Sequence, residues 1–175
     1  RVVAFSTLDI APTREMYREA GSAFAHTYWH WYWLTLAHPF AETLIGADPA
    51  FFWLSKCGAG SAGLAPFVQQ ALDEYLTCFA DPQAIHGACE DYRAAASIDL
   101  AHDDAEGGKV TTPLLALWGQ DGAIAAHFDC LALWKERAAN VTGWALPGGH
   151  YLAEEHPQHV IDAWVPFFAK AMAGR

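Results

Sequence analysis

Two apolar runs near the end of the chain constrain its fold more than any other feature of the sequence. Residues 114–119 (LLALWG) are apolar throughout and end in glycine, and residues 141–146 (VTGWAL) form a second run. Residues 124–138 between them read as a helix. The order strand, helix, strand predicts a parallel sheet, whose central strands are buried on both faces. An apolar opening run at residues 1–6 and an amphipathic helix over residues 157–172 extend this α/β pattern.

The long segment between the first and second predicted strands reads as helical. We expect one long helix over residues 13–36 and further helices near residues 38–50, 50–57, 66–79 and 81–97. The acidic stretch at residues 102–108 is predicted to be a loop. The predicted domains are a core strand with an acid loop (residues 1–12), a helical domain (13–108) and the rest of the core (109–175). Three strands make a poor sheet by themselves, so we expect more of the core upstream of residue 1.

Composition and charge exclude several classes of protein. The 175 residues are 53% hydrophobic and only 17% charged, which argues against disorder. The formal net charge of the chain is −10. It also argues against nucleic acid as a partner, since that affinity depends on Lys and Arg. No stretch approaches the roughly 20 apolar residues of a membrane span. The four cysteines lie far apart without C-x-x-C spacing, so we expect free thiols and a cytoplasmic location.

His150 is the strongest candidate for a catalytic base. It follows the sequence Pro-Gly-Gly at the end of a predicted strand, and ligands of parallel sheets bind outside the carboxyl ends of the strands. Two carboxylates compete to orient its imidazole, as the acid does in a hydrolytic triad. Asp9 follows the first predicted strand and Asp121 follows the second. Each candidate also has an ordinary explanation, a surface-loop histidine or a turn-forming aspartate, and the local sequence leaves this choice open.

The aromatic run at residues 28–33 (YWHWYW) is the oddest segment of the chain. Six successive residues cover every side of a helix, so they cannot all face one core. Some must face a cavity, a partner or solvent. His30 and Trp31 offer two adjacent N–H donors, and Tyr92 on a later helix offers a phenol. Core packing is the competing interpretation for these side chains, and Arg93 is expected to pair with an acidic residue.

The histidines and cysteines show no spacing typical of a metal site, and no phosphate-binding loop is visible. We therefore expect neither a metal nor a cofactor. Residues 59–63 (AGSAG) resemble a nucleophile elbow, but that turn needs a preceding strand, and a helix is predicted there. Ser61 is therefore not expected to be a nucleophile.

Four segments together resemble the haloacetate (fluoroacetate) dehalogenases. They occur in the order of that family and are LDIAPT at residues 8–13, YWHW at 28–31, CEDYRA at 89–94 and LPGGH at 146–150. The resemblance spans essentially the whole chain and implies the C-terminal part of an α/β-hydrolase fold with a helical cap insertion. It implies that His150 is the base and Asp9 its acid. It further implies that the leaving halide is bound by His30, Trp31 and Tyr92.

The implied reaction is hydrolysis of fluoroacetate or chloroacetate to glycolate and halide through an aspartyl-ester intermediate. The nucleophilic aspartate and two arginines of the family would lie upstream of residue 1, so the chain alone is expected to be inactive. Its ligand would be a small haloacid. A homodimer is compatible with these features, although the sequence does not reveal the oligomeric state. Small residues stand at 58–63 where the family often has tryptophan, which leaves the halogen preference open.

Two other functions stay open. An epoxide or ester hydrolase could share the scaffold, although an epoxide hydrolase would typically have two cap tyrosines and only Tyr92 is a convincing candidate. Alternatively, the chain could be a non-catalytic fragment or a binding module. An upstream G-x-D-R-G sequence would favour the dehalogenase, and an upstream G-x-S-x-G sequence would favour the esterase.

Overall fold

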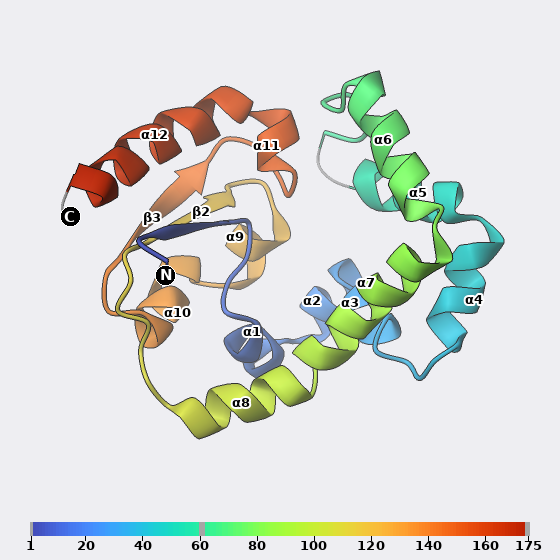
Figure 1. Cartoon of the computed structure of the whole chain (residues 1–175), viewed down its shortest axis with the longest axis horizontal. Helices are drawn as coiled ribbons and strands as arrows, with labels where there is room; N and C mark the ends of the chain where they lie inside the picture. Colours follow the sequence, from blue (N-terminus) through green and yellow to red (C-terminus); the bar gives the residue numbers. More distant parts are fainter. Residues whose placement is uncertain (1, 60–61, 174–175) are drawn as a thin grey trace. The chain divides into compact units, whose positions relative to one another are not determined.

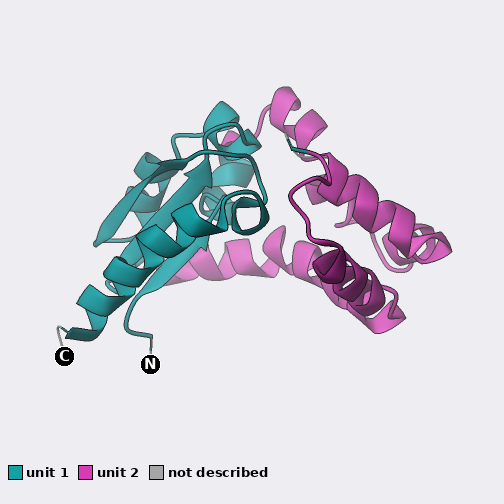
Figure 2. Ribbon diagram, turned by 90° about the horizontal axis from the view of Figure 1, so that it is seen from above, with its two compact units in different colours: residues 1–18, 60–62, 107–175 teal, residues 19–59, 63–106 magenta. Residues whose placement is uncertain are grey.

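The computed structural model describes residues 2–59 and 62–173, and the chain divides into two compact units (Figure 2). Unit 1 consists of residues 1–18, 60–62 and 107–175, and unit 2 consists of residues 19–59 and 63–106. The residues expected at the start of the helical domain, 13–18, group with unit 1. The domain boundaries predicted at residues 12 and 108 remain predictions.

Unit 1 contains a parallel sheet with the spatial order β1-β2-β3 (Figure 1). Its strands are β1 (Phe5–Leu8), β2 (Leu114–Gly119) and β3 (Val141–Leu146). The parallel pairing is confirmed, and β2 and β3 have the predicted bounds. β1 begins at Phe5 instead of at the start of the chain. Phe5 pairs with Leu114, and the preceding Pro113 has no N–H with which to extend the ladder.

Helices cover both faces of this sheet. They are α9 (Ala123–His127), α10 (Cys130–Arg137), α11 (Leu152–Glu155) and α12 (Pro157–Ala173). Leu115 and Leu117 of β2 join Val160 of α12 in one buried cluster. Leu114 and Ala116, which point to the opposite face of β2, are also fully buried, and α9 and α10 contact this strand. The burial of both faces explains why the sequence of β2 is apolar throughout.

The single helix predicted over residues 124–138 is wrong, because Asp129 begins a new helix. The Asp129 carboxylate accepts a hydrogen bond from the Ala132 N–H (3.0 Å), which is a typical N-cap. The predicted C-terminal helix is confirmed as α12.

Unit 2 has only helices as regular structure among its described residues. They are α2 (Ser22–Thr27), α3 (His30–Trp33), α4 (Phe40–Ala47), α5 (Pro49–Gly58), α6 (Gln69–Phe79), α7 (Pro82–Ala95) and α8 (Ile98–Glu106), and α1 (Thr13–Glu19) straddles the boundary between the units. Leu34, Ile45 and Ile85 form part of its buried core, and Tyr92 packs against them.

Two sequence predictions for this helical region are wrong. The long helix over residues 13–36 is three short helices, because Gly21 is extended and Tyr28 leaves helical geometry. The loop predicted over residues 102–108 is helical as far as Glu106, where Gly107, with φ of +57°, follows in the conformation typical of a helix end. Ser61, not expected to be a nucleophile, lies outside the described residues.

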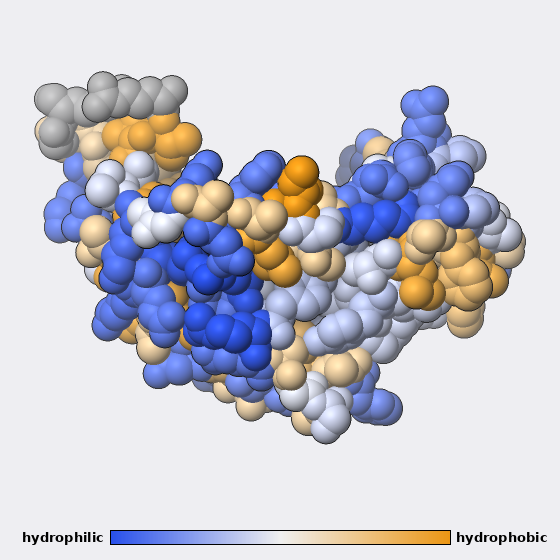
Figure 3. All heavy atoms as spheres, turned by 90° about the horizontal axis from the view of Figure 1, so that it is seen from below, coloured by the Kyte–Doolittle hydropathy of each residue, from blue (hydrophilic) through white to orange (hydrophobic). Residues whose placement is uncertain are grey.

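All four cysteines are free thiols, as predicted. Within the described residues, no helix combines the length and the apolar character that crossing a membrane requires. On the face drawn in Figure 3, apolar residues form separate groups among hydrophilic ones.

Candidate active-site residues

Asp9 and His150 lie together at the carboxyl ends of the strands in unit 1. The His150 Nδ1 atom is 2.6 Å from the Asp9 Oδ2 atom. Asp9 directly follows β1, and His150 follows the turn after β3. A parallel sheet brings these two positions to one edge, where α/β proteins bind ligands. The distance is that of a short, charge-assisted hydrogen bond.

Backbone groups hold the Asp9 carboxylate in a buried position. Asp9 is only 1% exposed, and its Oδ1 atom accepts a hydrogen bond from the Gly119 N–H (3.0 Å). Its φ of +47° lies in the left-handed region, so the chain turns sharply directly after β1. The Trp134 indole N–H fixes the next residue by donating to the Ile10 carbonyl (2.8 Å). These contacts fix the orientation of the carboxylate independently of His150.

A tight turn presents the His150 imidazole, whose side chain is 43% exposed. Gly148 adopts φ of +104°, which residues with a side chain rarely do. The Glu155 carboxylate accepts hydrogen bonds from the N–H groups of Gly149 (2.7 Å) and Tyr151 (3.1 Å), the two neighbours of His150. This role of Glu155 was not predicted from the sequence, because nothing there distinguishes it from the adjacent Glu154.

The pairing with Asp9 determines what the His150 imidazole can do. When the ionised carboxylate accepts a hydrogen bond from the Nδ1–H of the neutral ring, Nε2 carries a lone pair and can take a proton from water. Asp121, the competing acid, is exposed, and its backbone N–H donates to the Gly148 carbonyl (3.0 Å). The geometry favours Asp9 as the carboxylate that orients His150.

The three predicted halide donors lie together in unit 2. The ring centroids of His30 and Tyr92 are 5.8 Å apart, and those of Trp31 and Tyr92 are 6.4 Å apart. His30 and Trp31 are 6% and 7% exposed. Burial raises the pKa of the Tyr92 phenol, and the charge of Asp91 adds to this effect, so the phenol keeps its proton at neutral pH. The rings of these three side chains therefore pack against one another, with His30 and Trp31 buried.

The sequence predicted that the side chains of the aromatic run cannot all be buried, and this is confirmed. Trp29 and Tyr32 are 47% and 39% exposed, whereas Tyr28 is buried with His30 and Trp31. Lys56 adds a cation to the buried part, because its Nζ atom lies 2.7 Å from the His30 Nδ1 atom. The sequence carried no signal for this contact, since 26 residues separate the two side chains.

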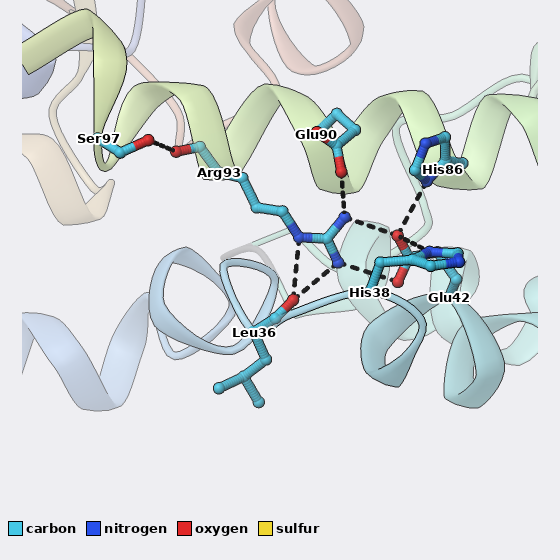
Figure 4. A network of polar contacts seen from close by, with 7 residues as sticks. All are labelled: Leu36, His38, Glu42, His86, Glu90, Arg93 and Ser97. Carbon is cyan, nitrogen blue, oxygen red and sulfur yellow. Dashed lines mark hydrogen bonds and ion pairs between the residues drawn. The ribbon is translucent and has the colours of Figure 1, made fainter.

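A second polar network in unit 2 surrounds Glu42 (Figure 4). Arg93 donates from Nη1 to Glu42 Oε1 (2.7 Å) and from Nη2 to Glu42 Oε2 (3.0 Å), and it also donates to Glu90 (2.6 Å). The predicted pairing of Arg93 with an acidic residue is confirmed. The Arg93 guanidinium holds the pKa of Glu42 far below its usual range, and Glu42 in turn raises the pKa of Arg93.

Two histidines approach the same carboxylate and form a group that could hold a metal ion. The Nδ1 atoms of His38 and His86 lie 3.2 Å and 3.1 Å from Glu42 Oε1, and the three ligand atoms lie within 4.8 Å of one another. The sequence did not reveal this group, because 44 residues separate His86 from Glu42. A divalent cation would have to share the carboxylate with the Arg93 guanidinium. We therefore interpret the group as part of an ion-pair network that ties α7 to α4.

Among the curated proteins that match the chain are two that it covers over part of their length. The chain is 37% identical to a fluoroacetate dehalogenase of Burkholderia sp., over 99% of this chain and 58% of that protein. It is 34% identical to a soluble epoxide hydrolase of Corynebacterium sp. (strain C12), over 59% of this chain and 35% of that protein. The chain thus spans little more than half the length of the first relative. No protein-family model matches the sequence.

Solved structures share the fold at higher identity. A protein of Nostoc sp. PCC 7120, provisionally assigned as an α/β hydrolase, has a TM-score of 0.90 and 45% identity, and the match covers 93% of this chain and 56% of that chain. A protein of Salmonella enterica, provisionally assigned as an acyltransferase, has a TM-score of 0.92 and 40% identity, covering 98% and 57%. These similarities and the parallel sheet confirm the predicted fold. The chain shares the α/β-hydrolase fold.

Proposed function

We propose that the chain is the C-terminal part of a hydrolytic dehalogenase that converts fluoroacetate or chloroacetate to glycolate and halide. The observation that carries this proposal is the 2.6 Å contact between His150 Nδ1 and the buried Asp9 carboxylate. It supports a general base at a sheet edge where α/β enzymes act on their substrates. The 37% identity to a fluoroacetate dehalogenase supports the class of substrate, a small haloacid.

In the first proposed step, a nucleophilic aspartate outside these 175 residues attacks the carbon that bears the halogen. A C–O bond forms, the carbon–halogen bond breaks, and the halide leaves with the bonding electron pair. His30, Trp31 and Tyr92 donate hydrogen bonds to the leaving halide. Donors that are already oriented towards developing charge lower the barrier by several kcal/mol, by about 3 for each well-placed group.

In the second proposed step, His150 takes a proton from water through Nε2, and the water oxygen attacks the carbonyl carbon of the ester. The bond from this carbon to the glycolate oxygen breaks, and the imidazolium returns the proton to that oxygen. Asp9 stabilises the imidazolium while it exists, because its ionised carboxylate lies beside Nδ1. The aspartic acid that this leaves releases its proton to solvent, which restores the carboxylate nucleophile, and no cofactor takes part.

An epoxide hydrolase is the second candidate, and the 34% identity to a soluble epoxide hydrolase over 106 residues favours it. The same base and acid would serve its ester intermediate. The difference lies in unit 2, where the N–H groups of His30 and Trp31 accompany the phenol of Tyr92. Neutral N–H donors beside a phenol suit a small anion, which is why the dehalogenase remains the first proposal.

The test is release of halide by the protein that contains this chain together with the upstream half found in its relatives. We expect fluoride and glycolate from fluoroacetate, chloride and glycolate from chloroacetate, and loss of both activities in the Tyr92→Phe variant. Diol formation from an epoxide without halide release would favour the second candidate, and ester hydrolysis alone would exclude both. The cytoplasmic location and the homodimer remain predictions from the sequence.

A further inference from the structure

His30 has a cationic neighbour in the core of unit 2. The Lys56 Nζ atom of α5 lies 2.7 Å from the Nδ1 atom of His30 in α3. An ammonium group carries three N–H donors and no acceptor, so a charged Lys56 can only donate to this nitrogen. In that state Nδ1 of His30 must carry the lone pair.

Two features of the surroundings act on the charge of Lys56. Burial lowers the pKa of its amine to about 8, and Cys57 acts in the opposite direction as the smaller cause. The amine also lies 5.8 Å from the centroid of the Trp29 ring, whose negative face stabilises a cation. Because pH 7 is about one unit below this pKa, most Lys56 amines are charged there. Lys56 is therefore the donor at neutral pH.

We propose that Lys56 is a positioning residue that keeps the proton of the neutral His30 imidazole on Nε2. With Nδ1 accepting from Lys56, the single N–H of the ring is at Nε2, and this group can donate to an anion. The opposite tautomer would present a lone pair to that anion and repel it. The contact with Lys56 selects the tautomer that a halide donor needs.

The other rings around His30 leave this assignment in place. The ring centroids of Tyr28, Trp29 and Tyr92 lie 5.2, 6.0 and 5.8 Å from that of His30. Tyr92 is titratable, but burial raises its pKa, so it is neutral wherever Lys56 is charged. The consequence for the leaving halide rests on the proposed dehalogenase function, whereas the tautomer itself does not.

Nitrogen NMR of the chain labelled in its histidines tests the tautomer directly. The shifts of the two ring nitrogens report which one carries the proton, and a His30→Gln variant identifies the His30 signals among the nine histidines. At pH 7 we expect a protonated Nε2 and an unprotonated Nδ1. Lys56→Met, similar in length but uncharged, should populate both tautomers. The matched control Lys170→Met removes an exposed lysine and should leave the His30 signals unchanged.

Kinetics of the protein with its upstream half separate positioning from folding. We expect Lys56→Met to lower kcat for fluoroacetate about 10-fold with little change in KM, because the donor acts on charge that develops at the halide. Activity of the unmodified protein should decline as the pH rises through the Lys56 pKa of about 8. Lys56→Arg stays charged at that pH, so its decline should move to higher pH.

The outcomes distinguish the two proposals. A protonated Nδ1 in the unmodified chain, or an unchanged tautomer in Lys56→Met, would overturn the assignment to Lys56. The expected tautomer shift without halide release by the unmodified full-length protein would overturn the dehalogenase function and support the tautomer assignment.

Discussion

His150 in unit 1 and His30 in unit 2 are the same side chain with partners of opposite charge. The Nδ1 atom of His150 lies 2.6 Å from the Asp9 carboxylate, and that of His30 lies 2.7 Å from the Lys56 amine. A carboxylate accepts a hydrogen bond from an Nδ1–H group, whereas an ammonium donates a hydrogen bond to an unprotonated Nδ1. Nε2 then carries a lone pair in His150 and an N–H in His30. At nearly equal distances, the charge of the partner decides whether a histidine is suited to be a base or a donor.

Burial separates the two histidines in the same sense. Within these 175 residues the His150 side chain is 43% exposed. His30 is 6% exposed, and hydrogen bonds to an anion are stronger where water is excluded. Partner charge and burial are therefore two independent reasons to expect different chemistry from the two rings.

The largest expected effect is the loss of the base. His150→Ala in the full-length protein should slow release of glycolate by about 10,000-fold, because no other group accepts the proton from water. The aspartyl ester should accumulate, which mass spectrometry of the denatured protein after mixing with fluoroacetate would detect. His159→Ala, a change of an exposed histidine on α12, is the control and should retain full activity. Rapid turnover by His150→Ala would show that His150 is not the base, and the contrast with His30 would then have no catalytic meaning.

The next effect concerns the acid that fixes the His150 tautomer. Asp9→Asn should lower kcat about 1,000-fold, because an amide can donate to Nδ1 and so favours the wrong tautomer. Asp121→Asn should change kcat less than about 3-fold, since a surface side chain is altered. Steady-state halide release by both variants decides between the two carboxylates. A larger loss of kcat in Asp121→Asn than in Asp9→Asn would show that Asp121, and not Asp9, is the acid that orients His150.

Glu42 tests whether a carboxylate beside a histidine is enough to make a base. Glu42→Gln should lower the free energy of unfolding by about 3 kcal/mol, because it leaves the largely buried Arg93 without its main partner. It should leave turnover nearly unchanged. Since Arg93 holds the pKa of Glu42 below its ordinary value of 4.5, the difference from the unmodified chain is complete above pH 4.5 and decreases as the pH falls below it.

Chemical unfolding at several pH values measures this effect. Glu90→Gln is the control, because the Glu90 side chain is 52% exposed and its loss should cost less than about 1 kcal/mol. Equal losses of unfolding free energy in the two variants would contradict the conclusion that Glu42 is the main partner of Arg93.

A change at Glu155 tests whether its carboxylate stabilises the turn that presents His150. Glu155→Gln weakens the acceptor for the N–H groups of Gly149 and Tyr151, so we expect a loss of about 1.5 kcal/mol in stability and a several-fold lower kcat. Thermal unfolding and halide release report the two effects. Glu154→Gln, one position earlier, should have less than half of either effect, and a reversed order would reject Glu155 as the anchor.

The smallest expected effect is the cost of placing a cation beside His30. Lys56→Met should raise the free energy of unfolding by about 1 kcal/mol at pH 7, less than the whole pKa shift implies because the amine keeps some contact with solvent. Burial lowers the pKa of Lys56 from 10.5 to about 8, so the unfolded chain binds more protons between these values. Stability of the unmodified chain should therefore rise over that range, and the advantage of Lys56→Met should disappear above it.

The sequence predicted best where one short segment contains the whole signal. The apolar runs of β2 and β3 set the bounds of those strands, and their order predicted a parallel sheet. Asp9 and His150 could be proposed because each directly follows a strand, and the carboxyl ends of parallel strands share one edge. The predicted helix boundaries were wrong where a single residue decides them. Gly21 is extended and ends the helical path, and the Asp129 side chain binds a backbone N–H at the start of a new helix.

The sequence by itself thus determined the fold class, the parallel sheet and the candidates at its carboxyl edge, since periodicity and strand order are local properties. Tertiary structure alone decided the partners. It brought Lys56 to His30 over 26 residues and Glu42 to Arg93 over 51 residues, and it selected Asp9 over Asp121 beside His150. A hydrogen bond depends on atoms within about 3 Å of each other, and only the packed chain determines which distant residues meet.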